Sequence, residues 1–305
     1  MKKLCALRRV FYFRFTNDDV FAIIFTVIKM NDFKNIKLIA LDLDDTTLRS
    51  DSSLAPETAR AICDALSAGV QVVIASGRAY KSLPQSVLGI EGIGYAITSN
   101  GAAIERVPSG ERIMNFTLSE SSVRQILQVF GDEMLECFID GQAYCEKLYH
   151  DDPIKYGSSE AYVEYVKTTR TPIKNIPQFM RAHIHELDSV DVLCGSVAHK
   201  NELWSKTKLL DDVYVTSSSP RLIEISNSSA GKGVSLRRLC KLIDVPPENV
   251  AAFGNGENDA DMLRFAGIGV AVGNAGEKCK AAADYVCETN DDLGVAKTIY
   301  KILGK

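Results

Sequence analysis

The 305-residue chain has no Cys-x-x-Cys pair, although it contains 8 cysteines. This excludes the usual zinc-binding spacing. Several cysteines lie inside apolar segments, such as Cys194 in VDVLCG and Cys240 in LRRLCKLI. That placement favours buried thiols in a reducing, cytoplasmic compartment over a disulfide framework. No charge of one sign dominates either. The formal net charge of −4 predicts neither a nucleic-acid partner nor binding to an anionic membrane.

Long hydrophobic runs are also absent. The segment VFAIIFTVI, at 20–28, is too short to span a bilayer. Residues 1–29 differ in character from the rest, and we expect them not to belong to the fold. Two interpretations stay open: translation starts near Met30, or residues 1–29 form a short membrane-associated leader.

From residue 36 the sequence alternates between predicted strands and helices. KLIALDLD (37–44) is a nearly continuous apolar run, as expected of a strand that is buried on both faces. PETARAICDALSAG (56–69) predicts a helix with Pro56 in its first turn. VQVVIASGR (70–78) predicts a second strand, followed by a helix from about Ala79. With YAITSNGA as a third strand, this order predicts a parallel sheet with helices on both faces.

Near residue 117 the pattern changes. A helix is predicted at 119–133, capped by Ser119 or Ser121. LECFIDGQAYCEK predicts a hairpin that turns at Asp140-Gly141. Further helices and the strand VDVLCG follow, and the strand–helix alternation returns after residue 213. We therefore predict an α/β core made of 30–117 and 214–305, with an α+β domain inserted at 118–213.

Polar residues follow the predicted strands, where ligands bind in open α/β sheets. They lie in four segments: IALDLDDTTLRS at 39–50, IASGR at 74–78, AGKG at 230–233 and GNGENDADM at 254–262. Carboxylates suit a divalent cation, while a hydroxyl and an ammonium suit phosphate oxygens. Alternation along the first strand predicts that Asp42 and Asp44 share one face and that Asp45 points away.

Each segment also has a simpler interpretation. Acidic turns and Ser-Gly turns such as Ser76-Gly77 are common, and GNGEND could be a helix cap. Lys232 could begin a solvated helix. However, a lysine at a helix N-terminus is unfavourable to the helix dipole, which favours a bound anion beside it. The conjunction of the four segments is a stronger indication than any one of them.

In this order, D-L-D-D-T, S-G-R, G-K-G and G-N-G-E-N-D resemble the four motifs of the haloacid dehalogenase-like (HAD) superfamily. The insertion between the second and third motifs resembles the large type-IIB cap of the Cof-type phosphatases. The resemblance covers residues 36–305. It implies a Rossmann-like α/β core with a parallel sheet and an inserted α+β cap of type C2B.

The resemblance implies a Mg²⁺-dependent phosphatase acting on a small phosphorylated metabolite. Asp42 would be the nucleophile that forms an aspartyl-phosphate, and Asp44 the general acid and base. Ser76 and Lys232 would hold the phosphoryl group. The implied Mg²⁺ site comprises Asp42, the Asp44 carbonyl, Asn255 and Asp259. The implied contacts to substrate or phosphate come from Thr46, Gly77, Arg78, Asn100 and Asn258.

One residue departs from the family pattern, because members usually carry Asp where Asn255 stands. An amide oxygen still ligates Mg²⁺, but one negative charge is lost and weaker metal binding is expected. Sugar phosphates are the favoured substrates, followed by pyridoxal phosphate and flavin mononucleotide. Two alternatives remain. The first is a catalytically impaired protein that binds a phosphorylated ligand or regulates a partner, and the second is a phosphoacceptor signalling module.

Overall fold

The computed structural model describes residue 33 and residues 35–305. The predicted leader at 1–29 lies outside the described residues. Within the described part, none of the helices combines the length and the apolar character that a membrane span requires. The cysteines of this part are all free, and all except Cys63 are buried, as the sequence predicted.

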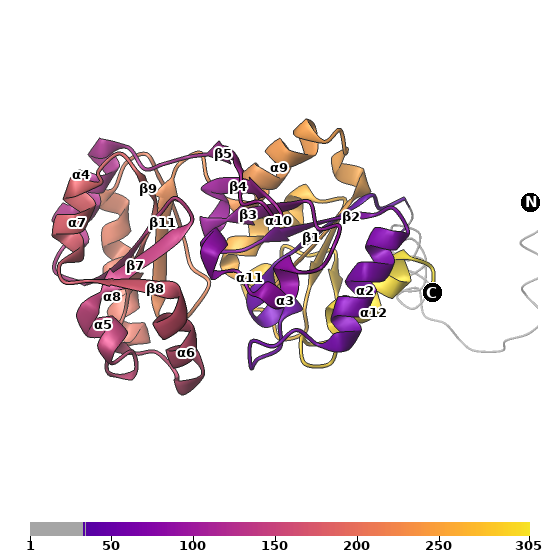
Figure 1. Ribbon diagram of the computed structural model, residues 1–305, viewed down its shortest axis with the longest axis horizontal. Helices are drawn as coiled ribbons and strands as arrows, with labels where there is room; N and C mark the ends of the chain where they lie inside the picture. The colour runs from indigo at the N-terminus through magenta and orange to yellow at the C-terminus, as the bar shows by residue number, and fades with distance from the viewer. Residues whose placement is uncertain (1–32, 34) are drawn as a thin grey trace, which may run out of the picture. The chain divides into compact units, whose positions relative to one another are not determined.

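The strands of residues 35–305 form an eight-stranded and a six-stranded sheet (Figure 1). The larger sheet has the order β14-β13-β12-β1-β2-β3-β4-β5. Its strands are β1 (Leu38–Leu41), β2 (Gln71–Ala75), β3 (Tyr95–Thr98), β4 (Ala103–Arg106), β5 (Arg112–Asn115), β12 (Val250–Gly254), β13 (Ile268–Ala271) and β14 (Tyr285–Val286). The six from β14 to β3 are parallel, which confirms the predicted α/β core.

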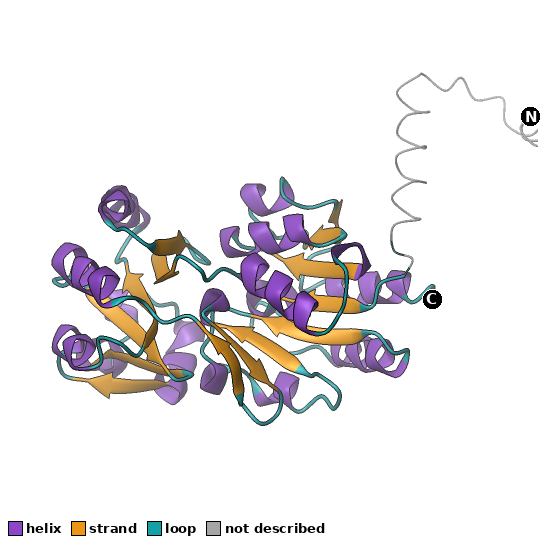
Figure 2. Cartoon of the chain, turned by 90° about the horizontal axis from the view of Figure 1, so that it is seen from above, coloured by secondary structure: helices purple, strands orange, loops and turns teal. Residues whose placement is uncertain are grey.

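Helices cover both faces of the larger sheet (Figure 2). They are α2 (Pro56–Ser67), α3 (Gln85–Leu88), α9 (Lys232–Leu242), α10 (Ala260–Phe265), α11 (Glu277–Lys280) and α12 (Gly294–Ile302). Helix α2 packs beside α12, and α9 beside α10. The sequence of α2 explains its limits. Pro56 begins it, Ala61, Ile62 and Ala65 form its buried stripe, and Gly69 follows its end at a φ of +85°.

Two features of the core differ from the prediction. The helix expected from about Ala79 is broken into a 3₁₀ turn, Tyr80–Ser82, and the short α3. The break lies at Leu83, whose extended conformation is the one favoured before Pro84. In addition, β4 and β5 extend the sheet as an antiparallel hairpin that the strand–helix pattern did not indicate.

The six-stranded sheet belongs to the inserted cap domain and has the order β10-β11-β9-β6-β7-β8. Its strands are β6 (Met134–Ile139), β7 (Gln142–Glu146), β8 (Arg170–Ile173), β9 (Leu187–Leu193), β10 (Val213–Thr216) and β11 (Leu222–Asn227). The predicted end of the insertion at residue 213 is therefore wrong. Strand β11 pairs with β9, and β10 pairs with β11, so the cap sheet continues to Asn227.

The cap helices are α4 (Glu120–Phe130), α5 (Lys147–Asp151), α6 (Glu160–Thr169), α7 (Ile176–Ala182) and α8 (Val197–Lys206). Side chains of α4, α7 and α8 pack with one face of the cap sheet into a common apolar core. Leu135 and Cys137 of β6 face this core, so alternation directs Glu136, which lies between them, to the opposite face. Arg112 of β5 joins the two domains through a bidentate pair with Asp188 of β9, at 2.8 and 2.6 Å.

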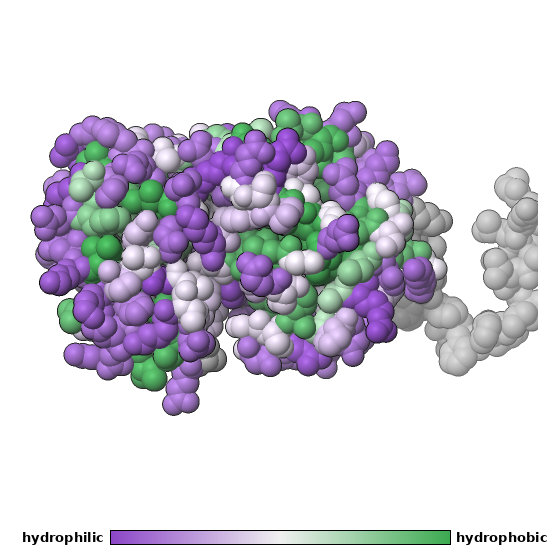
Figure 3. Space-filling view, viewed as in Figure 1, coloured by the Kyte–Doolittle hydropathy of each residue, from purple (hydrophilic) through white to green (hydrophobic). Residues whose placement is uncertain are grey.

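Hydrophilic residues cover most of the face in Figure 3, and apolar residues gather in smaller patches between them. Such a mixture is ordinary for a protein surface. This surface does not indicate a functional site, so the buried polar residues between the two domains are the candidates for one.

Candidate active site

The candidate site lies where the strand order of the larger sheet reverses. The chain passes from β1 to β2 in one direction along the sheet and from β12 to β13 in the other, while β1 and β12 are neighbours. The crevice outside the carboxyl ends of such strands is where open α/β sheets bind ligands. Asp42 directly follows β1 and Asn255 directly follows β12, so both lie at this point.

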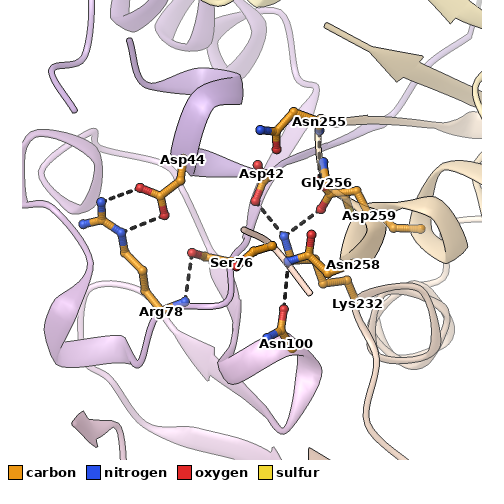
Figure 4. Close-up of polar contacts among 12 residues, drawn as sticks. Asp42, Asp44, Ser76, Arg78, Asn100, Lys232, Asn255, Gly256, Asn258 and Asp259 are labelled. Atoms are coloured by element: carbon orange, nitrogen blue, oxygen red, sulfur yellow. Dashed lines mark hydrogen bonds and ion pairs between the residues drawn. The ribbon is translucent and has the colours of Figure 1, made fainter. Parts of the chain in front are cut away.

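The acidic loop after β1 does not continue as a strand. Leu43–Thr47 forms an irregular turn, in which Asp44 is extended and Asp45 has a φ of +54°. Strand alternation therefore does not apply here: Asp42 and Asp44 do line one cavity, but so does Asp45, which was expected to point away. The two carboxylates point to different partners, Asp42 to Lys232 and Asp44 to Arg78 (Figure 4).

Lys232, the first residue of α9, is fully buried between two carboxylates. Its Nζ lies 2.6 Å from Asp42 Oδ1 and 2.6 Å from Asp259 Oδ1. Burial raises the pKa of Asp42 to about 7, and the Asp259 charge adds to this while Lys232 opposes it. For Lys232, burial works against the charge, but Asp259 and Asp42 outweigh it and raise the pKa of the ammonium. The site therefore keeps a permanent cation beside Asp42.

Asp259 also shapes the loop after β12. Its Oδ2 accepts hydrogen bonds from the backbone N–H groups of Asn255 and Gly256, each at 2.9 Å. Both of its oxygens are thus engaged, one by Lys232 and one by this loop. Such contacts suit a residue that positions the neighbouring groups. The side chain of Asn255 lies near Asp42 in Figure 4, and within the described residues it forms no hydrogen bond.

Ser76 and Arg78 follow β2. The Ser76 hydroxyl is fully buried and accepts from the Arg78 N–H at 3.1 Å. The Arg78 guanidinium donates to both oxygens of Asp44, at 2.9 and 2.5 Å. Between them, Gly77 packs so closely that an added Cβ would lie 3.0 Å from Glu224 Oε1 of the cap. Gly77 and Arg78 therefore line the cavity next to the cap, with Ser76 buried behind them.

Asn100 connects three parts of the site. Its backbone N–H donates to Ser76 O at 3.2 Å, and its carbonyl accepts from the N–H of Gly231 at 2.9 Å. Its side-chain oxygen accepts from Asn258 Nδ2 at 3.0 Å, and its Nδ2 donates to Glu224 at 2.8 Å. Asn100 therefore acts as a positioning residue that links the core loops to the cap.

Two further observations concern ligand binding. The Thr46 hydroxyl is buried, and no described residue forms a hydrogen bond with it. Asp42, Asp44 and Arg78 line a cavity of about 650 Å³ that extends from the core to the cap. This volume suits a small-molecule ligand.

The sequence reasoning missed the cap wall of this cavity. Glu136, Asp191 and Glu224 line it, together with Tyr165 and Arg170. A signal was present in the sequence, because the carboxylates stand alone within the apolar segments LECFI, VDVL and LIEI. A charged residue inside a strand that is otherwise apolar indicates that one face of the sheet contacts solvent or a ligand.

Comparison with known proteins defines the class. The haloacid dehalogenase-like hydrolase family matches residues 39–299. Phosphatase YwpJ of Bacillus subtilis is 31% identical over 290 residues, covering 88% of this chain and 100% of that protein. The 5-amino-6-(5-phospho-D-ribitylamino)uracil phosphatase YcsE of the same organism is 27% identical, with coverages of 87% and 95%.

A solved structure agrees with this. A haloacid dehalogenase-like hydrolase from B. subtilis is 29% identical with a TM-score of 0.76, covering 87% of this chain and 99% of that one. The chain thus belongs to the haloacid dehalogenase-like hydrolases, and the predicted family is confirmed. The predicted enzyme class, a hydrolase acting on phosphate monoesters, is confirmed at this level.

Proposed function

We infer that the chain is a Mg²⁺-dependent phosphatase that hydrolyses small phosphorylated metabolites through a phosphoaspartate on Asp42. The observation that carries this proposal is the Asp42 carboxylate at the strand-reversal point, held by the buried Lys232. Asp44 and Arg78 lie on the wall of the same cavity. Nucleophile, acid and cations are therefore available to one bound phosphate group.

In the first step, an oxygen of Asp42 bonds to phosphorus while the bond from phosphorus to the leaving oxygen breaks, and Asp44 gives that oxygen its proton. In the second step, a water oxygen bonds to phosphorus, Asp44 takes a proton from this water, and the bond from phosphorus to Asp42 breaks. Inorganic phosphate is released and both carboxyl groups return to their starting states. Lys232 and Ser76 stabilise the charge on the phosphoryl oxygens.

Arg78 controls when Asp44 can act. Both oxygens of Asp44 accept hydrogen bonds from the guanidinium, at 2.9 and 2.5 Å. This pair must open and Asp44 must take up a proton from solvent before it can give one to the leaving oxygen. Arg78 can then turn to the phosphate, for which its planar donors are well suited.

The oxygen atoms near Asp42 are suitable ligands for a hydrated Mg²⁺. Within the described residues, no three His, Cys, Asp or Glu side chains gather into a ready-made metal centre. However, Mg²⁺ is commonly held by one or two carboxylates and keeps several waters. Asp42 Oδ2 and the Asn255 amide, neither hydrogen-bonded within residues 35–305, and the Asp44 carbonyl supply suitable oxygens. When bound, the metal would neutralise charge on the transferring phosphoryl group.

Asn255 favours a second candidate function, a catalytically impaired protein that binds a phosphorylated ligand or regulates a partner. With an amide in place of a carboxylate, the site has one charge fewer for the metal. In that case the protein would bind phosphate esters without turning them over.

Hydrolysis of p-nitrophenyl phosphate with and without millimolar Mg²⁺ separates the two candidates. The proposal expects Mg²⁺-dependent release of phosphate by the wild type and its loss in Asp42→Asn. Asp51→Asn is the matched control, because Asp51 is an exposed carboxylate in the loop that follows. If the wild type binds phosphate esters but shows no turnover, the impaired protein is the better description.

A screen of phosphorylated metabolites then addresses the substrate. Sugar phosphates are the favoured class, and pyridoxal phosphate and flavin mononucleotide are further candidates. The substrate in the name of the YcsE relative, 5-amino-6-(5-phospho-D-ribitylamino)uracil, belongs in the same screen.

A further inference from the structure

Three carboxylates form a row across the face of the cap sheet that lines the cavity. Glu136 of β6 is the direct cross-strand partner of Asp191 of β9, which is in turn the partner of Glu224 of β11. Their exposed fractions are 2%, 6% and 4%. Like charges directly opposite one another destabilise a sheet, and burial increases the effect. Stability of the cap fold therefore does not explain this row.

The outer two carboxylates have partners in the protein. Arg170 donates to both oxygens of Glu136, at 2.9 and 3.1 Å. Glu224 accepts from Asn100 Nδ2 at 2.8 Å and from the Ser218 N–H at 2.5 Å. Each carboxylate thus has a donor for both of its oxygens.

Asp191, in the middle of the row, has none. Among the residues that the structure describes, no group donates a hydrogen bond to its carboxylate or forms an ion pair with it, although the side chain is almost fully buried and lines the cavity. Burial and the charges of Glu224 and Glu136 raise the pKa of Asp191, and the charge of Arg170, which is paired with Glu136, opposes this only in part. Because Asp191 lines the cavity, its hydrogen-bond donor must come from the cavity, either as water or as a group of a bound ligand.

The charges nearby favour a cationic donor over a neutral one. Arg170 is engaged by Glu136, and Arg221, the other cap guanidinium on the cavity wall, is exposed and donates to Gly157 O at 3.0 Å. Hydroxyl groups could supply the hydrogen bonds of Asp191 but could not offset the negative charge of the carboxylate row. A protonated amine would do both.

The aromatic wall of the cavity supports the same conclusion. The ring of Tyr165 has the Arg78 guanidinium at 4.2 Å and the Arg170 guanidinium at 4.4 Å from its centroid. Tyr149 and Tyr162 also line the cavity. Faces of such rings attract cations, so Tyr149 and Tyr162 offer the cavity aromatic surface suited to a further cation, whereas Tyr165 already contacts two guanidiniums.

We propose that Asp191 binds an ammonium group on the leaving-group side of the substrate, so that the substrate class is amine-bearing phosphate monoesters. This specificity rests on the proposed phosphatase reaction, because the phosphate end of the same ligand must lie at Asp42. The cap would thus select the alcohol part of the ester by its charge. Glu136 and Glu224 would flank Asp191 on either side of the bound ammonium group.

The test compares phosphate esters that differ in one group. Aminoalkyl phosphates of increasing length are paired with hydroxyalkyl phosphates of the same length, and the phosphate of glucosamine is paired with that of glucose. We expect the amine to be preferred by about tenfold or more in kcat/KM in at least one pair. In Asp191→Asn this preference should fall toward one. In Asp132→Asn, an exposed carboxylate of the cap, it should be retained.

The outcomes separate this specificity from the phosphatase reaction itself. If the wild type hydrolyses p-nitrophenyl phosphate but prefers no amine in any pair, the ammonium subsite is refuted and the phosphatase stands. If the wild type shows no turnover at all, calorimetric binding of the same pairs decides: tighter binding of an amine, lost in Asp191→Asn, supports the subsite, and equal binding refutes it. The wild-type comparison holds even if Asp191→Asn does not fold.

Discussion

Replacing Lys232 by methionine removes the ammonium that lies 2.6 Å from both Asp42 and Asp259. Methionine keeps most of the length and apolar volume of the lysine, so packing around α9 changes little. What changes is the charge, because two buried carboxylates lose their common cation. The expected result is a large loss of stability at neutral pH.

The magnitude follows from the burial of the three side chains. Removing one partner of a buried ion pair costs about 3–5 kcal/mol, because the other charge remains buried without a partner. Asp259→Asn removes one of the two carboxylates that Lys232→Met leaves behind. The loss in the double variant should therefore be smaller than the sum of the two single losses by about 1–3 kcal/mol. Because unpaired carboxylates take up protons more readily, the loss in Lys232→Met should shrink as the pH is lowered.

Urea unfolding followed by far-ultraviolet circular dichroism measures these free energies, in buffer with a chelator so that no metal contributes. Phosphatase assays run in parallel should show turnover lowered by about 10²–10³-fold in Lys232→Met and no recovery in the double variant, because the phosphoryl group has lost its cation. Lys241→Met is the matched control. Lys241 is exposed on the same helix, so its replacement should change stability by no more than about 0.5 kcal/mol.

Additivity would refute the reasoning. If the losses of the two single variants sum to that of the double within about 0.5 kcal/mol, Lys232 and Asp259 are not energetically coupled. A loss in Lys232→Met no larger than that in Lys241→Met would contradict the buried ion pair itself.

Three further substitutions test the metal site, a buried carboxyl group and a close backbone contact. Asn255→Asp restores a carboxylate beside Asp42, so the Mg²⁺ concentration for half-maximal turnover should fall by about tenfold in a metal titration. Burial raises the pKa of Glu105 from 4.5 to about 7. Between these pH values the folded protein binds one proton more than the unfolded chain. The free energy of unfolding should therefore fall by up to about 3 kcal/mol as the pH rises from 4.5 to 7. Glu105→Gln should flatten that dependence in urea unfolding at several pH values. Gly101→Ala should lower the free energy of unfolding by about 2–4 kcal/mol, because φ is +88° and a Cβ would lie 2.4 Å from Gly231 O. Gly69→Ala should lower it by only about 1 kcal/mol, because φ is similar, at +85°, but the Cβ would enter open space.

Controls accompany each of these predictions. An unchanged Mg²⁺ requirement in Asn255→Asp would mean that position 255 does not contact the metal. The exposed Glu111 provides the comparison for Glu105, and parallel pH curves for wild type and Glu105→Gln would contradict the assigned titration. Equal losses in Gly101→Ala and Gly69→Ala would show that backbone strain alone matters and that the contact with Gly231 does not.

Several elements were predictable because their causes are local. The apolar run of β1, Pro56 at the start of α2 and the Asp140-Gly141 turn each depend on residues within one or two turns of the chain. The same holds for α4, which begins after Ser119, one of the two predicted caps, with the Ser119 hydroxyl accepting from the Ser122 N–H at 3.1 Å. The motif residues at strand ends were predictable for a related reason, since the carboxyl ends of parallel strands meet at one edge.

Other features arise only when distant segments pair. Strand β11 joins the cap sheet by pairing with β9, and β10 joins it by pairing with β11. The direction of the Asp44 carboxylate depends on Arg78, which comes from another strand end. The row formed by Glu136, Asp191 and Glu224 exists because three strands align in one register. Local preferences identify each carboxylate as a charge in an apolar strand. Hydrogen bonds between strands far apart in the chain decide that the three stand side by side and face the cavity that begins at Asp42.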